Sequence, residues 1–184
     1  AGSIDFADGL RMVAKRGEIM SKIKSGGMAA VIGLDADAIR ETLSAIPSPD
    51  IDLANFNSPG QIVVSGPAGK IEEILLPLKD AGAKLVVPLK VSGAFHSRMM
   101  EAPALQFKEF LESFSFSSPR IPVYSNVEAQ PYADAETIPS LLVRQMHSPV
   151  RWSDTIIQMR KSGAEEFLEC GPGKVLTKLL WQIA

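Results

Sequence analysis

Residues 51–67 read IDLANFNSPGQIVVSGP, in which two strand-like runs flank a turn at residues 57–60. The runs Ile51 to Phe56 and Gln61 to Ser65 are short, apolar and rich in β-branched residues, as strands are. Proline and glycine in the sequence between them favour a chain reversal. The stretch therefore predicts two consecutive strands joined by a turn, and the elements on either side extend this unit.

The flanking segments complete a regular alternation of strands and helices. A strand is predicted at 28–34, a helix opened by an acidic cap at 35–46, a second helix at 67–81 and a fourth strand at 83–88. The resulting order, β-α-β-β-α-β, is that of the split βαβ or ferredoxin-like arrangement. We therefore predict a small ferredoxin-like α+β lobe over residues 27–88.

The remaining sequence predicts a larger α/β lobe formed by residues 1–26 and 89–184. Residues 5–24 predict an amphipathic helix, with Asp5 as its N-cap. Its expected buried stripe consists of Phe6, Leu10, Val13, Gly17 and Met20. Further helices are predicted at 97–114, 138–146, 152–162 and 174–183, and strands at 121–125 and 166–169. Strands that alternate with helices are typical of a parallel sheet.

Composition restricts the classes of protein that this chain can represent. Its 184 residues carry 19 basic and 21 acidic side chains, a net charge of −2, which lacks the electrostatic footprint of a nucleic-acid binder. The single cysteine, Cys170, excludes an intramolecular disulfide and a CxxC zinc site. Apolar runs stay far below the roughly 20 residues that span a bilayer. We expect no membrane partner and a location in the reducing cytoplasm.

Two histidines are the first candidates for acid–base chemistry. His96 lies in a glycine-containing loop at 91–96, and His147 lies just after a predicted helix. On position alone, a histidine in either place is more often structural than catalytic. Ser92 and Ser97 flank His96 too closely to face it, and Ser97 is better interpreted as a helix N-cap. No serine lies in a GxSxG elbow, and no HExxH or His/Cys cluster predicts a metal site.

Two further features leave alternatives open. The turn at 171–173 resembles a phosphate loop, but the upstream glycine and the Ser or Thr after the lysine that such a loop requires are missing. A turn that starts a helix is therefore favoured, although the N-terminus of that helix could attract an anion. Arg16 borders the predicted buried stripe. Either its aliphatic part packs against the core while its guanidinium reaches water, or the guanidinium binds a carboxylate.

Seven stretches together resemble malonyl-CoA:acyl carrier protein transacylases. They occur in the order typical of that family and run almost from end to end of the chain. They are AGSIDFAD at 1–8, KRG at 15–17, ANFNSPGQIVVSG at 54–66, GAFHS at 93–97, YSNV at 124–127, QMHSPVRW at 145–152 and ECGPGKVL at 169–176. The resemblance implies a hydrolase-like α/β lobe with an inserted ferredoxin-like lobe.

The resemblance also implies roles for individual residues. His96 would be the catalytic base toward a serine and the acid toward the leaving thiolate, and the backbone carbonyl of Gln145 would fix its tautomer. Arg16 would pair with the free carboxylate of malonyl, Asn57 would line the cleft, and Phe95 would crowd an α-methyl branch. The implied substrate is malonyl-CoA and the implied acceptor is acyl carrier protein in fatty-acid biosynthesis, with no metal or redox cofactor.

The family's nucleophile elbow and oxyanion hole have no counterpart in the sequence. The resemblance places them upstream of Ala1, so we expect this chain to be the carboxyl-side part of a transacylase, inactive alone and a partner of its missing amino-terminal part. Two alternatives stay open: an acyltransferase domain of a polyketide or fatty-acid megasynthase, and a non-catalytic α/β binding module.

Overall fold

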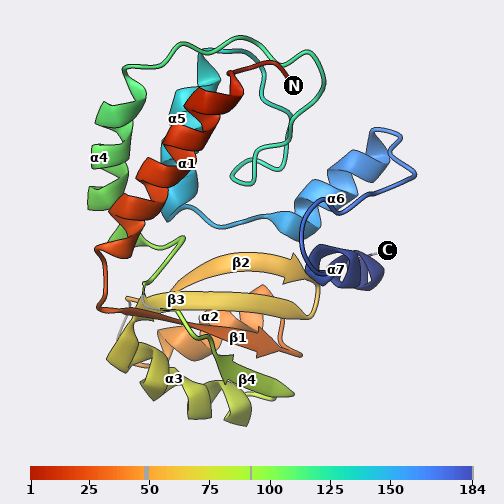
Figure 1. Ribbon diagram of the computed structural model, residues 1–184. Helices are drawn as coiled ribbons and strands as arrows, with labels where there is room; N and C mark the ends of the chain where they lie inside the picture. The colour runs from red at the N-terminus through yellow and green to blue at the C-terminus, as the bar shows by residue number, and fades with distance from the viewer. Residues whose placement is uncertain (48–49, 92, 184) are drawn as a thin grey trace.

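A four-stranded antiparallel sheet lies at one end of the molecule (Figure 1). The computed structural model describes residues 1–47, 50–91 and 93–183. The sheet has the order β2-β3-β1-β4, and two helices cover one of its faces. Its elements are β1 (Gly26–Ile32), α2 (Ala36–Ser44), β2 (Asp52–Ser58), β3 (Gln61–Pro67), α3 (Ala68–Asp80) and β4 (Leu85–Pro88). The predicted order β-α-β-β-α-β is confirmed.

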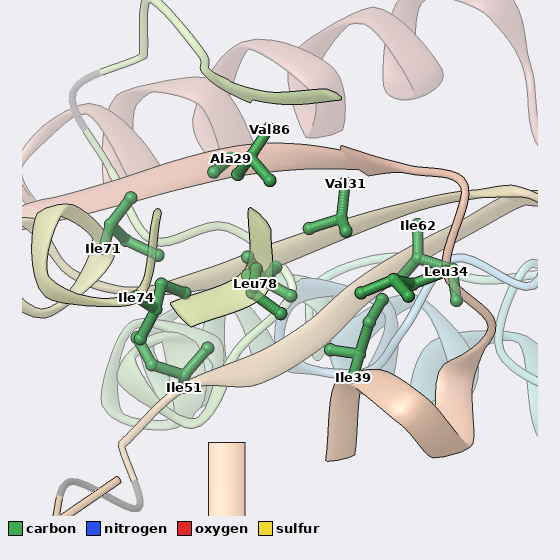
Figure 2. Packing of buried hydrophobic residues seen from close by; sticks show 11 residues of the cluster. Ala29, Val31, Leu34, Ile39, Ile51, Ile62, Ile71, Ile74, Leu78 and Val86 are labelled. Carbon is green, nitrogen blue, oxygen red and sulfur yellow. The ribbon is translucent and has the colours of Figure 1, made fainter. Parts of the chain in front are cut away.

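The sheet and its two helices share one apolar core, which Figure 2 shows. Alternate residues of the strands point toward the helices, as the two-residue period of a strand requires. Ala29 and Val31 of β1 and Val64 of β3 are fully buried and meet Ile39 of α2 and Leu78 of α3. The helix α2 begins as predicted, because the Asp35 carboxylate accepts the Ala38 N–H at 2.9 Å.

Three helices pack together beyond the sheet: α1 (Phe6–Ser21), α4 (Glu101–Leu111) and α5 (Thr137–His147). A short 3₁₀ turn, η1 (Arg98–Met100), leads into α4. Their shared core is rich in methionine and includes Met12, Ile19, Met100, Phe107 and Met146. This packing anchors both ends of the candidate site described below, because α1 carries Arg16 and α5 carries Gln145.

The predicted buried stripe of α1 is confirmed at Met20 and wrong at its other four positions. Phe6, Leu10 and Val13 are 86%, 58% and 69% exposed, whereas the buried residues are Met12, Ile19 and Met20. Both sets satisfy helical spacing, and packing against α4 selects the second. The N-cap prediction is confirmed, since Asp5 accepts the Asp8 N–H at 2.8 Å.

Two C-terminal helices, α6 (Trp152–Lys161) and α7 (Val175–Ile183), pack beside β2 (Figure 1). A short parallel bridge joins Asn55 of β2 to Val150. In it, Val150 N–H donates to Ala54 at 2.8 Å, and Phe56 N–H donates to Val150 at 2.9 Å. The free edge of β2 is therefore fixed to the segment that follows α5.

The predicted strands at 121–125 and 166–169 do not form. Tyr124 makes only an isolated bridge to Pro131, and 166–169 is irregular. Within the described ranges the sheet is entirely antiparallel, because neither segment finds a neighbouring strand to complete its hydrogen bonds. The hydrolase-like lobe and the two-lobe division therefore stay predictions. In the same ranges, no helix combines the length and apolar character that crossing a bilayer requires.

Candidate active site around His96 and Arg16

The imidazole of His96 is held by two backbone carbonyls at the C-terminal end of α5. Its Nδ1 lies 2.9 Å from the oxygen of Gln145 and 3.2 Å from that of Ser148. A carbonyl can only accept a hydrogen bond, so Nδ1 carries the proton in the neutral ring. Nε2 is then unprotonated and can serve as a base.

The backbone at His96 adopts an unusual conformation to reach this position. Its φ is +57°, in the left-handed region that non-glycine residues avoid. Such a conformation costs about 1–3 kcal/mol and persists only when surrounding contacts impose it. Here the His96 N–H donates to Met146 at 3.2 Å. Ser97 caps η1 as predicted, accepting the Met99 N–H at 3.3 Å.

The surroundings of His96 favour its neutral form. Burial is the largest influence and lowers the pKa of the imidazole from its ordinary value of 6.5, and the charge of Arg16 lowers it further. The carbonyls of Gln145 and Ser148 act in the opposite direction without reversing the shift.

Arg16 projects from α1 into a largely apolar environment. Its side chain is half-buried, and burial lowers the pKa of its guanidinium from the ordinary value. Its Nε is buried and has no hydrogen-bond partner among the described residues. A buried donor without an acceptor is costly, so a ligand carboxylate would satisfy it well. This observation favours the carboxylate clamp over the packed-stem alternative.

Arg16 and His96 line two adjacent cavities. A cavity of about 460 Å³ is lined by Arg16, Gln145 and mainly apolar side chains. A more polar cleft of about 680 Å³ contains His96, His147, Asp52 and Arg98. Gln145 connects the two, because its carbonyl binds His96 while the residue lines the Arg16 cavity. The structure thus brings together three of the five predicted site residues.

The other two predicted site residues lie outside both cavities. Asn57 is a half-buried residue of β2, beside Phe56, which does line the His96 cleft. Phe95 packs against the apolar clusters on either side of the loop and lies over Gly93. Their roles in lining the cleft and in selectivity stay predictions. Ser92, which precedes Gly93, falls outside the described residues.

Several features of the site had no sequence signal. The Ser148 and Met146 carbonyls act through the backbone, which any residue provides.

The predicted anion position at the start of α7 holds the chain's own Glu169. Its carboxylate accepts the Thr177 N–H at 2.9 Å and the Thr177 hydroxyl at 2.6 Å. These hydrogen bonds lower the pKa of Glu169, the Thr177 hydroxyl most strongly. This helix end therefore binds an internal anion.

The described part of the chain contains no recognisable set of metal ligands. No group of three or more His, Cys, Asp or Glu side chains is arranged there to hold an ion. Cys170 is exposed and free.

Known proteins with the same organisation are acyltransferases. The chain matches the model of the acyl transferase domain over residues 1–182. It is 46% identical over 184 residues to the polyketide biosynthesis malonyl CoA-acyl carrier protein transacylase PksC of Bacillus subtilis, and the match covers 100% of the chain and 64% of that protein. It is 40% identical over 188 residues to the malonyl CoA-acyl carrier protein transacylase of Staphylococcus aureus, with 100% and 61% covered.

A solved structure has the same fold over the whole chain. The crystal structure of an acyl carrier protein S-malonyltransferase from Vibrio cholerae superposes with a TM-score of 0.95 at 38% identity, covering 100% of the chain and 61% of that protein. The chain thus spans less than two thirds of the length of each of these relatives. Because the family model accounts for residues 1–182, the chain belongs to the acyl transferase domain family.

Proposed function

We propose that the protein containing this chain transfers malonyl from CoA to the phosphopantetheine thiol of acyl carrier protein. The observation that carries the proposal is the 2.9 Å hydrogen bond between His96 and Gln145, which leaves Nε2 free as a base, while Gln145 also lines the cavity of the half-buried Arg16. The named activities of the relatives support the same substrate and acceptor.

The proposed reaction has two symmetrical halves. A serine hydroxyl, supplied by a part of the intact protein outside these 184 residues, gives its proton to Nε2 of His96 as its oxygen attacks the malonyl thioester carbonyl. The C–S bond breaks, and the imidazolium returns the proton to the leaving CoA thiolate. The pantetheine thiol of acyl carrier protein then gives its proton to Nε2 and attacks the seryl ester; the ester C–O bond breaks, and the imidazolium returns the proton to the serine oxygen. Arg16 holds the distal carboxylate throughout.

The biological setting that we favour is polyketide or fatty-acid biosynthesis. The relative named for polyketide biosynthesis is 46% identical and the one named only as a transacylase is 40% identical. Both names specify the same donor and acceptor, so the two settings share one chemistry. No redox cofactor is needed for it, since acyl transfer between oxygen and sulfur changes no oxidation state, and the proposed steps use no metal.

The decisive test compares malonyl and acetyl transfer by the intact protein. Arg16→Ala removes the partner of the malonyl carboxylate, which acetyl lacks. We expect malonyl transfer from radiolabelled malonyl-CoA to fall at least about 100-fold, in line with the loss of a charged bidentate contact. Acetyl transfer should change little or improve.

The neighbouring Lys15 provides a matched control. Its ammonium is paired with Glu18 at 2.9 Å, so Lys15→Ala removes a cation from the same helix without touching the cavity. This variant should keep the malonyl preference. Equal losses of malonyl and acetyl transfer in Arg16→Ala would contradict the clamp, and failure of malonyl-CoA to label the intact protein would contradict the proposed function.

A further inference from the structure

The loop that presents His96 is fixed from its other side by Asp52, the first residue of β2. One carboxylate oxygen accepts the backbone N–H of Arg98 at 2.9 Å. The two oxygens also accept from the Arg98 side chain, from Nε at 3.1 and 3.0 Å and from the terminal nitrogen Nη2 at 2.6 Å. Asp52 thus binds both the main chain and the side chain of a residue 46 positions away.

This contact lies two residues beyond the left-handed backbone of His96. The His96 main chain is held on one side by Met146, and its ring by Gln145 and Ser148. The chain after it is held by Asp52 at residue 98. A left-handed histidine relaxes to ordinary φ values unless its neighbours prevent it, so the contacts on both sides are needed to keep the ring in place.

Both supports of His96 converge on β2. The segment that binds the imidazole continues into Val150, which bridges to Ala54 and Phe56 of β2. The segment that follows the imidazole is bound by Asp52 of the same strand. The side chain of Asp52 is only 23% exposed, and it lines the same cleft as His96. One strand therefore sets the distance between the two segments that determine the orientation of the ring.

We propose that Asp52 is a positioning residue for His96: its carboxylate fixes the backbone at residue 98 and so keeps Nδ1 on the Gln145 carbonyl. In the acyl transfer proposed above, on which this role depends, a displaced ring would move Nε2 away from the serine. Misplacement by about 1 Å commonly costs about 100-fold in rate. The hydrogen bonds of Asp52 go to Arg98 and not to His96, so the proposed role acts through the backbone of the loop.

Three variants separate this role from an ordinary surface ion pair. Asp52→Ala removes every contact, Asp52→Asn keeps an oxygen for the Arg98 N–H, and Arg98→Ala keeps the N–H and the carboxylate but removes the guanidinium. We expect kcat to fall 10- to 100-fold in Asp52→Ala and several-fold less in the other two, with KM changing less than about threefold. Glu73→Ala, which removes the exposed Lys70–Glu73 pair of α3, should leave kcat unchanged.

The position of the ring is measured independently of catalysis. In ¹⁵N-histidine-labelled protein, His96 should show a single Nδ1-protonated tautomer at neutral pH, and Asp52→Ala should mix the tautomers while Glu73→Ala should not. If Asp52→Ala fails to fold, Asp52→Thr replaces it, because threonine suits a strand. Its hydroxyl lies one bond short of the carboxylate oxygens, so we expect the same fall in kcat and the same mixing of tautomers.

Unchanged kcat and an unchanged tautomer in the folded Asp52 variants would overturn the proposal. So would equal damage from Arg98→Ala and Asp52→Ala, because the side-chain ion pair would then explain the whole effect. A wild-type protein that transfers no malonyl would instead contradict the proposed function, and the tautomer measurement would still decide the role of Asp52.

Discussion

The lowered pKa of His96 gives a direct prediction at the scale of one residue. Burial and the charge of Arg16 both disfavour the imidazolium, so the ring gives up its proton below the ordinary 6.5. The rate of acyl transfer should therefore rise with pH through a midpoint below 6.5. Arg16→Gln removes the second influence and should move the pKa of His96 upward in an NMR titration.

The same shift links protonation of His96 to stability. The folded protein binds this proton less readily than the unfolded chain does, so this contribution to the free energy of unfolding is complete above pH 6.5 and is lost as pH falls through the folded pKa. His96→Gln should flatten that part of the stability profile. An imidazole pKa above 6.5 in the folded protein would contradict the assigned surroundings.

At the scale of elements, the approach of β1 to the His96 loop depends on a glycine. A Cβ at Gly26 would overlap the backbone nitrogen of Ala94, two residues before His96. Gly26→Ala must push the loop away from the sheet, and we expect it to destabilise the protein by about 1–3 kcal/mol. It should also slow acyl transfer, because the loop carries the base.

Gly17 provides the control for this substitution. It lies inside α1, and no atom within 4 Å would meet its Cβ. Gly17→Ala should stabilise the helix by about 0.5–1 kcal/mol, as alanine does in helix interiors. Thermal melts of the two variants should therefore shift in opposite directions, and a neutral Gly26→Ala would show that the loop is not held against β1.

The elements that the sequence predicted correctly are those that complete their backbone hydrogen bonds locally, the helices within themselves and the four strands within one segment. Residues 26–88 form their sheet and helices from one continuous segment, so periodicity and turn residues were sufficient. The segments 121–125 and 166–169 have the composition of strands but no neighbouring strand in the described chain. Sequence patterns report what a segment can form, whereas pairing decides what it does form.

At the scale of the whole molecule, the candidate site depends on contacts between distant segments. Motifs identified His96, Gln145 and Arg16 because their side-chain or sequence contexts are distinctive. Asp52 and Arg98 escaped notice because an aspartate in a strand and an arginine after a histidine are ordinary residues until the fold joins them. Helical spacing likewise could not distinguish the buried side of α1 from its exposed apolar side.

That exposed apolar side of α1 gives a prediction for the intact protein. Phe6, Leu10 and Val13 lie on one face of the helix and contact solvent in these 184 residues, while the relatives are longer than the chain. We expect further residues of the intact protein to cover this face. Leu10→Gln should then change the stability of the 184-residue chain by at most about 0.5 kcal/mol, as exposed substitutions do.

In the intact protein, the same Leu10→Gln substitution would bury a polar amide in place of an aliphatic side chain. We expect a loss of about 2–4 kcal/mol in the free energy of unfolding, measured by denaturant titration. Leu76 provides the control: it is 65% exposed and lies in α3, away from α1. Leu76→Gln should therefore change the free energy of unfolding only slightly in both proteins. If Leu10→Gln is equally mild in both, the face of α1 stays open to solvent and the remaining residues pack elsewhere.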